Sequence, residues 1–303
     1  MIPFKYKFEY FLFRFLLVIV GLMPPLWVYK LGLGFGLFCY YTGIRKSVVD
    51  KNLEVAFGES LSLDERNILC KNTFKSIGAV MFEVLLMRFI SKDRIGDYIQ
   101  LEGVEILKDA LSENKGVIMV GSHFGNWELL SAAISTFAAP IYGYAGLQKN
   151  PLFDNDLNQI RQKFGTVTIS KSKTATLEMM KSLKEGNIVG IVGDLNVPNR
   201  NLFIPFFGKP AAIGTGFSTF AAKRKTPVIF IYNIRQAPLK YKGCIKRLHF
   251  ESIGVLEQDI HTITELYVKE LETIIKEYPD HYFWVNRRWK TRPKDEIGED
   301  IYN

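Results

Sequence analysis

Short apolar or β-branched segments that alternate with helical segments constrain the fold of this chain more than any other feature. The apolar segments lie at residues 117–120, 141–145, 166–169, 188–192 and 227–232. Helical patterns separate them, at residues 126–137, 153–164, 174–184 and 215–225. Strands that alternate with helices pair into a largely parallel sheet covered by helices. The sequence therefore predicts an α/β fold with a mostly parallel central sheet flanked by helices.

The octapeptide GSHFGNWE, residues 121–128, directly follows the first of these strands and holds His123, one of only four histidines. Ligands bind such sheets at the carboxyl ends of the strands, which is where His123 is expected. Two side chains five residues apart on one helix point about 140° apart. If His123 lies in the loop, Glu128 in the first helical turn and Gly125 at a bend, the carboxylate reaches the imidazole.

A carboxylate on one ring nitrogen fixes the tautomer of the histidine and leaves the other nitrogen free to take a proton from a hydroxyl. This arrangement suits direct attack by a substrate hydroxyl on an activated acyl group. A buried histidine with a structural role explains the same spacing, and the octapeptide alone does not separate the two. A Ser122 nucleophile is disfavoured because G-x-S-x-G is absent, and a metal site because no second His or Cys is close in sequence.

The amino terminus is apolar, and Glu9 and Arg14 are the only charged residues between Lys7 and Lys30. This length is roughly enough to cross a bilayer, although Arg14 and the Pro24-Pro25 pair interrupt it. No small-x-small cleavage site follows, so we expect an uncleaved membrane anchor at residues 1–30, with an apolar core helix as the alternative. The basic flanking residues are expected on the cytoplasmic side of that membrane.

Residues 31–100 are expected to form a helical, membrane-proximal region, and residues 101–303 the α/β domain. Glycines in the first part of that region, at positions 32, 34, 36 and 43, favour close packing or an interfacial segment over a free helix. A long helix is expected from about residue 61 to residue 88, because apolar residues recur there at helical spacing.

Composition limits the class of partner and of protein. The chain has 39 Lys and Arg against 31 Asp and Glu, a formal charge of +8, which favours nucleic acid, anionic lipid or an acidic carrier protein. A hydrophobic content of 48% with 23% charged residues is globular rather than disordered. The three cysteines lie far apart and indicate neither a disulfide framework nor a zinc site.

Four blocks in the same order carry a family resemblance. They are GSHFGNWE; NPLF at residues 150–153 with Arg161 and Gly165; GDLN at residues 193–196 with IPFFGKPAA at 204–212; and WVNRRWKTRP at residues 284–293. With these blocks the sequence resembles the lysophospholipid acyltransferase superfamily, and within it the lipid A biosynthesis (late, secondary) acyltransferase branch. Departures from the branch's pattern are Leu195, Asn286 and Trp289.

The resemblance implies that His123 is the general base, that Glu128 is its charge partner and that Arg161 helps to stabilise the oxyanion. The substrate-binding positions that follow are Asn126, Asn150, Asp194, Phe206, Phe207, Gly208, Arg287, Arg288, Lys290 and Arg292. The last four lie near Trp284 and Trp289 and are expected to hold a phosphorylated headgroup or phosphopantetheine at the bilayer interface. Without the resemblance, Arg161 is best explained as a solvated arginine, whereas a turn role for Asp194 and core packing for Phe206 and Phe207 explain the sequence as well as a functional role does.

The resemblance further implies a membrane-associated O-acyltransferase. It is expected to move a fatty acyl chain from an acyl carrier protein thioester to a hydroxyl of a lipid A precursor, with no metal, no cofactor and no nucleic acid. Transfer to another membrane lipid, such as an aminolipid, a glycolipid or a lysophospholipid, is an alternative. A non-catalytic, basic lipid- or nucleic-acid-binding protein is a second one, but it leaves His123 and Glu128 unexplained.

Overall fold

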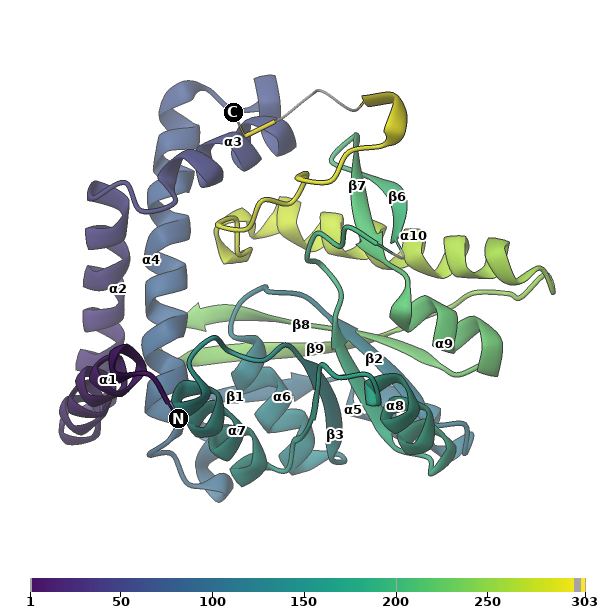
Figure 1. Ribbon diagram of the computed structural model, residues 1–303, viewed down its shortest axis with the longest axis horizontal. Coiled ribbons are helices and arrows are strands. Elements are labelled where there is room, and N and C mark those ends of the chain that lie inside the picture. The colour runs from purple at the N-terminus through teal and green to yellow at the C-terminus, as the bar shows by residue number, and fades with distance from the viewer. Residues whose placement is uncertain (1, 200, 297–300, 303) are drawn as a thin grey trace.

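A seven-stranded sheet in the order β1-β9-β8-β2-β5-β3-β4 forms the centre of the molecule (Figure 1). The computed structural model describes residues 2–199, 201–296 and 301–302. The strands are β1 (Ile99–Glu102), β2 (Val117–Gly121), β3 (Ile141–Ala145), β4 (Val167–Ser170), β5 (Ile188–Val192), β8 (Val228–Ala237) and β9 (Lys240–Leu248). Neighbouring strands are parallel except for the β8–β9 pair. The predicted mostly parallel α/β sheet is therefore confirmed.

Helices cover both faces of the sheet. On one face lie α5 (Val104–Ser112), α6 (Trp127–Phe137) and α7 (Pro151–Phe164); on the other lie α8 (Ala175–Lys184), α9 (Gly216–Arg224) and α10 (Leu256–Glu277). Alternate residues of β2 face the two sets of helices. Met119 belongs to the same hydrophobic cluster as Leu130 of α6, and Val120 to the same cluster as Leu271 of α10. Strands covered on both faces read as continuous apolar runs, which is why the sequence located them.

A two-stranded hairpin, β6 (Asn201–Phe206) and β7 (Lys209–Gly214), stands apart from the central sheet. Its turn contains Phe207 and Gly208, both with positive φ. The C-terminal segment packs against the hairpin, and Trp284 and Trp289 are fully buried there. The expectation that these two tryptophans seat at a bilayer interface was therefore wrong, because both rings form part of the protein core.

Four helices precede the sheet: α1 (Phe4–Leu22), α2 (Pro25–Tyr41), α3 (Lys46–Phe57) and α4 (Leu63–Met87). Among the described residues, no helix combines the length and the apolar character needed to span a membrane. The spanning anchor expected at residues 1–30 is therefore not found. The Pro24-Pro25 pair divides that segment between two helices, and α1 carries four charged residues, Lys5, Lys7, Glu9 and Arg14.

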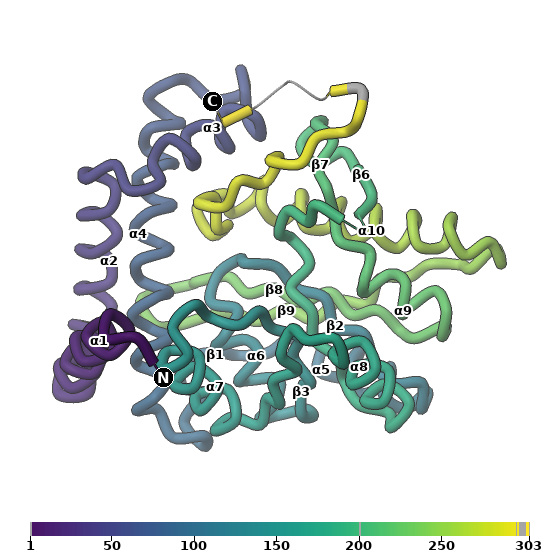
Figure 2. The backbone as a smooth tube through the Cα atoms, in the orientation of Figure 1, coloured from purple at the N-terminus to yellow at the C-terminus, as the bar shows by residue number. Residues whose placement is uncertain are grey.

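Helices α2 and α4 pack at very short range through glycines, beside the sheet rather than on it (Figure 2). A Cβ atom added at Gly36 would lie 2.1 Å from the carbonyl oxygen of Phe74, and one at Gly78 would lie 2.2 Å from the carbonyl oxygen of Gly32. The close packing predicted from the glycines is therefore confirmed for Gly32 and Gly36. The long predicted helix is α4, which begins with a capping box between Ser62 and Glu65.

Short 3-10 turns connect these elements: η1 (Gly58–Ser60), η2 (Lys92–Asp97), η3 (Pro279–His281) and η4 (Lys294–Glu296). One of them, η3, places the chain that follows α10 beside the loop after β2, since the backbone nitrogen of Gly125 donates to the carbonyl oxygen of His281. The C-terminal segment thus supports the loop that carries His123.

Candidate active site

The loop between β2 and α6 holds His123 at the carboxyl edge of the sheet, as the sequence predicted. Gly125 makes the bend with φ of +57°, and a side chain there would meet Asn233, whose Oδ1 would lie 2.2 Å from the added Cβ. The Asn233 amide holds the same loop, because it accepts from the backbone nitrogen of Asn126 and donates to its carbonyl oxygen. Asn126 in turn caps α6 by accepting from the backbone nitrogen of Leu129.

Asp194, not Glu128, is the hydrogen-bonding partner of His123. Its Oδ1 lies 2.9 Å from Nδ1 of the imidazole, and its side chain is almost fully buried. Sheet register explains the contact: Gly121, the last residue of β2, is paired with Val192, the last residue of β5, and His123 and Asp194 each follow two residues later in the chain. The expected contact between His123 and Glu128 is therefore corrected, since the residue that reaches the ring comes from the neighbouring strand.

The environment stabilises opposite charges on this pair. Burial disfavours protonation of His123, but the Asp194 carboxylate outweighs burial and raises the pKa of the imidazole. Burial also disfavours ionisation of Asp194, yet His123 and then Arg288 lower the pKa of that carboxyl. A neutral imidazole with its proton on Nδ1 donates to this carboxylate, which leaves Nε2 as the basic nitrogen.

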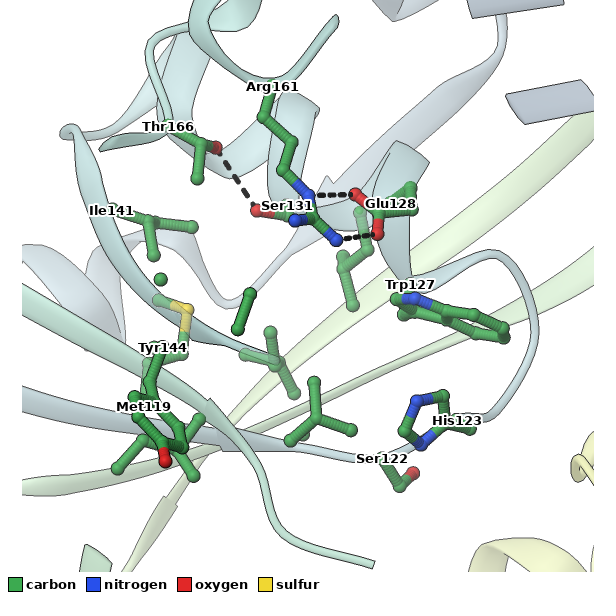
Figure 3. Close-up of a pocket in the computed structure, with 18 of the residues that line it drawn as sticks. Met119, Ser122, His123, Trp127, Glu128, Ser131, Ile141, Tyr144, Arg161 and Thr166 are labelled. Atoms are coloured by element: carbon green, nitrogen blue, oxygen red, sulfur yellow. Dashed lines mark hydrogen bonds and ion pairs between the residues drawn. The ribbon is translucent and has the colours of Figure 1, made fainter. Parts of the chain in front are cut away.

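Glu128 instead forms a bidentate ion pair with Arg161, which joins α6 to α7 (Figure 3). The distances are 3.0 Å from Nε to Oε2 and 2.5 Å from the second guanidinium nitrogen to Oε1. Both side chains are mostly buried. Glu128 still acts on His123 over a longer range, because its negative charge also favours the imidazolium. The carboxylate therefore fixes a guanidinium in the cavity that His123 also lines.

A cavity of about 390 Å³ connects these groups. His123, Glu128 and Arg161 line it together with Trp127, and its deeper wall includes apolar residues of the sheet such as Met119 (Figure 3). A polar group of catalytic type thus faces a partly apolar pocket, the usual composition of a small-molecule site.

The other residues predicted for substrate binding lie elsewhere. Asn126 caps α6 and Asn150 caps α7, where its amide also donates to the carbonyl oxygen of Tyr6. Seven further positions are not among the described residues that line the cavity: Phe206, Phe207, Gly208, Arg287, Arg288, Lys290 and Arg292. Their role in substrate binding stays a prediction, and it would have to be exerted outside this cavity.

Arg288 was predicted to contact substrate, but its guanidinium is buried behind Asp194. One terminal nitrogen donates to the carbonyl oxygen of Ala212, and the group lies over the ring of Phe206 at 5.3 Å. Its Nε and second terminal nitrogen have no hydrogen-bond partner. The positive charge lowers the pKa of Asp194, so Arg288 supports the ionised carboxylate beside His123. The basic C-terminal block gave no signal of this role in the sequence.

Comparison with known proteins identifies the family of this chain. The family model described as bacterial lipid A biosynthesis acyltransferase matches residues 3–291. The chain belongs to this family. The resemblance seen in the four sequence blocks is thereby confirmed, and the protein is an O-acyltransferase of the lipid A biosynthesis type.

Several relatives of this acyltransferase have curated descriptions. It is similar to a lipid A biosynthesis lauroyltransferase of Escherichia coli, with 28% identity, covering 91% of this chain and 89% of the relative. A palmitoleoyltransferase of lipid A biosynthesis from the same organism is 26% identical, covering 84% of this chain and 81% of the relative. A lipid A biosynthesis acyltransferase of Haemophilus influenzae is 27% identical, covering 90% of this chain and 87% of the relative.

Proposed function

We propose that this acyltransferase moves a fatty acyl chain from an acyl carrier protein thioester to a hydroxyl of a lipid A precursor, with His123 as general base. The observation that carries the proposal is the hydrogen-bonded pair of His123 and Asp194 at the edge of a partly apolar cavity. The relatives include a lauroyltransferase and a palmitoleoyltransferase of lipid A biosynthesis, which supports a fatty acyl group as the group transferred and a lipid A precursor as the acceptor.

In this mechanism Nε2 of His123 takes the proton of the acceptor hydroxyl while the hydroxyl oxygen attacks the thioester carbonyl carbon. The carbonyl oxygen then carries negative charge, and the imidazolium is stabilised by the buried Asp194 carboxylate. Collapse of the tetrahedral intermediate breaks the carbon–sulfur bond. The departing thiolate takes the proton from Nε2, so the products are an ester and a free thiol.

Arg161 is the donor we assign to the oxyanion. Its guanidinium lines the cavity and is oriented in advance by two bonds from Glu128, so little reorganisation is needed when charge develops. Glu128 accordingly acts through Arg161 and through its charge, as a positioning residue, rather than by a direct bond to the imidazole. In this assignment His123 and Glu128 both take part in the reaction, but Glu128 acts through its ion pair with Arg161.

We further propose that α1 lies along the cytoplasmic face of the inner membrane. A stripe of exposed apolar residues runs along this helix at helical spacing: Phe4, Phe8, Phe11, Phe15, Val18 and Leu22. Leu26 and Trp27 of α2 extend it. A contiguous exposed apolar face with adjacent lysines suits a helix in the membrane interface, and anionic lipid attracts the basic chain.

Transfer of a labelled acyl group from acyl carrier protein to a hydroxyacylated lipid A precursor, followed by mass spectrometry, tests the proposed reaction. His123→Ala should lower the rate by at least about a thousandfold, the scale of loss when a base and its partner are removed. His261→Ala is the matched control, because this histidine is exposed on α10. Equal activity of both variants would refute the assignment of the base.

Binding to vesicles that contain anionic phospholipid tests the membrane surface separately. Phe11→Asp combined with Phe15→Asp places two charges on the stripe and should abolish binding. Leu177→Asp, on an exposed position of α8, should leave binding intact. Equal binding of the stripe variant and the control would show that another surface meets the membrane.

A further inference from the structure

The floor of the cavity is formed by one row of residues that crosses four strands. Met119 of β2 is paired with Gly190 of β5, Gly190 with Gly143 of β3, and Gly143 with Thr168 of β4. Residues paired in this way project from the same face of a sheet. Two neighbouring members of the row are glycines, so the sheet presents a trough on the side covered by α6, and all four residues line the cavity.

The two glycines differ in the space above them. A Cβ atom at Gly190 would lie 2.7 Å from Cγ2 of Ile141, so that space is already filled by a side chain. A Cβ atom at Gly143 would meet only Cγ2 of Thr166, at an ordinary contact distance of 3.5 Å. The trough is therefore open above Gly143, and a side chain there would project into the cavity without displacing its neighbours.

Ile141 and Thr166 close the inner end of the trough. Oγ1 of Thr166 is hydrogen bonded to the hydroxyl oxygens of Ser131 and Ser135 on α6, at 3.2 Å and 2.9 Å, so β4 and α6 are joined at this end (Figure 3). Ile141 is in register with Ile188, which is paired with Val117 at the start of β2. The closed end thus lies four strand residues, about 13 Å, before Gly121 and further still from His123.

We propose that Gly143 determines the length of acyl chain that this cavity accepts. The inference rests on the proposed function: the thioester lies at His123, and the chain runs along the trough, over Gly143, to Ile141 and Thr166. A methylene group fills roughly the volume share of a water molecule, ~30 Å³. The cavity of about 390 Å³, which the chain shares with the thioester and the acceptor hydroxyl, therefore has room for at most on the order of a dozen methylene groups.

Gly143→Ala and Gly143→Val test the proposal, with saturated acyl carrier protein thioesters of increasing chain length as donors. Each methylene that can no longer be buried should lower the relative kcat/KM by about fourfold, the effect of one buried CH₂. Gly143→Val should thus lower the ratio of dodecanoyl to octanoyl transfer by roughly an order of magnitude or more, and Gly143→Ala by a smaller factor. Ile141→Ala, which opens the end, should shift the preference toward longer chains.

Gly216→Ala is the matched control. It is the exposed first residue of α9, where an added Cβ meets nothing within 4 Å, and it should keep the wild-type chain-length profile. An equal loss of rate for every chain length in the Gly143 variants, with no shift in Ile141→Ala, would overturn the inference. If the wild type transfers no acyl chain, the proposed function fails. Competition of fatty acids of different length for a bound fluorescent fatty acid then measures the same length preference without transfer.

Discussion

Replacement of Asp194 by asparagine tests the electrostatic basis of the site most directly. Asparagine keeps the size of the side chain but removes the negative charge that lies 2.9 Å from Nδ1 of His123. The carboxylate raises the pKa of His123 against the effect of burial, so its loss should lower that pKa. The base must be neutral to accept a proton, and the wild-type rate therefore falls as pH drops through the raised pKa. In Asp194→Asn this acid limb should move to lower pH.

The same change should lower the maximal rate. An orienting carboxylate beside a catalytic histidine contributes up to about 10⁴ in kcat in a Ser-His-Asp triad. Arg161 still stabilises the oxyanion in the variant, so we expect a loss of about 10² to 10⁴, or about 3 to 5 kcal/mol of transition-state stabilisation. The imidazolium that forms during the reaction would then be buried without its counterion, which is the physical source of the loss.

The assay is the pH dependence of kcat/KM for acyl transfer. Asp280→Asn is the control, because Asp280 also bonds Nδ1 of a histidine, His281, at 2.9 Å, but neither residue lines the cavity. The control should change the rate by less than a few-fold and leave the acid limb in place. An Asp194→Asn enzyme with the wild-type rate and the wild-type acid limb would refute the role of the pair.

Three further outcomes follow from other contacts. Glu128→Gln should weaken the ion pair with Arg161 and lower kcat by roughly 10- to 100-fold with little change in KM, because an interaction specific to the transition state is lost. Steady-state kinetics measures both constants, and an effect on KM alone would contradict the prediction. Gly36→Ala should lower the free energy of unfolding by about 1 to 3 kcal/mol, because it overpacks α2 on α4. Gly34→Ala, where an added Cβ meets nothing within 4 Å, should raise it by up to about 1 kcal/mol. Urea unfolding measures both variants, and equal changes in the two would contradict the prediction. Ser62→Ala removes the N-cap of α4 and should cost about 1 kcal/mol by the same measurement.

The parallel strands were predictable because they are covered on both faces. Residues 141–145 and 188–192 coincide with β3 and β5, and each reads as an uninterrupted run without charge. Strand β9 was missed because its sequence, KYKGCIKRL, mixes lysines and an arginine with apolar residues, as an antiparallel strand near a sheet edge permits. The β6–β7 hairpin was missed for a different reason. Its turn residues, Phe207 and Gly208, were interpreted as substrate contacts and not as a turn.

The position of His123 was predictable from the strand that precedes it, but the identity of its partner was not. Glu128 is five residues away and was the nearest carboxylate in the sequence, whereas Asp194 is seventy-one residues away. Only the order of strands in the sheet, with β5 next to β2, brings Asp194 to the ring. Since α6 starts at Trp127, Glu128 already lies in the helix and points to α7, where Arg161 meets it. Local spacing identified two residues that line the same cavity, but it paired them wrongly.

His123 and Asp194 each lie two residues beyond the end of their strand, so their contact depends on the alignment of β2 with β5. A slip of β5 by one residue against β2 would turn the side chains of that strand to the opposite face of the sheet and would move Asp194 by about 3.3 Å. A chain with that error would keep nearly all its secondary structure and lose the carboxylate beside its base. Acyl transfer is therefore a sensitive report of correct strand alignment.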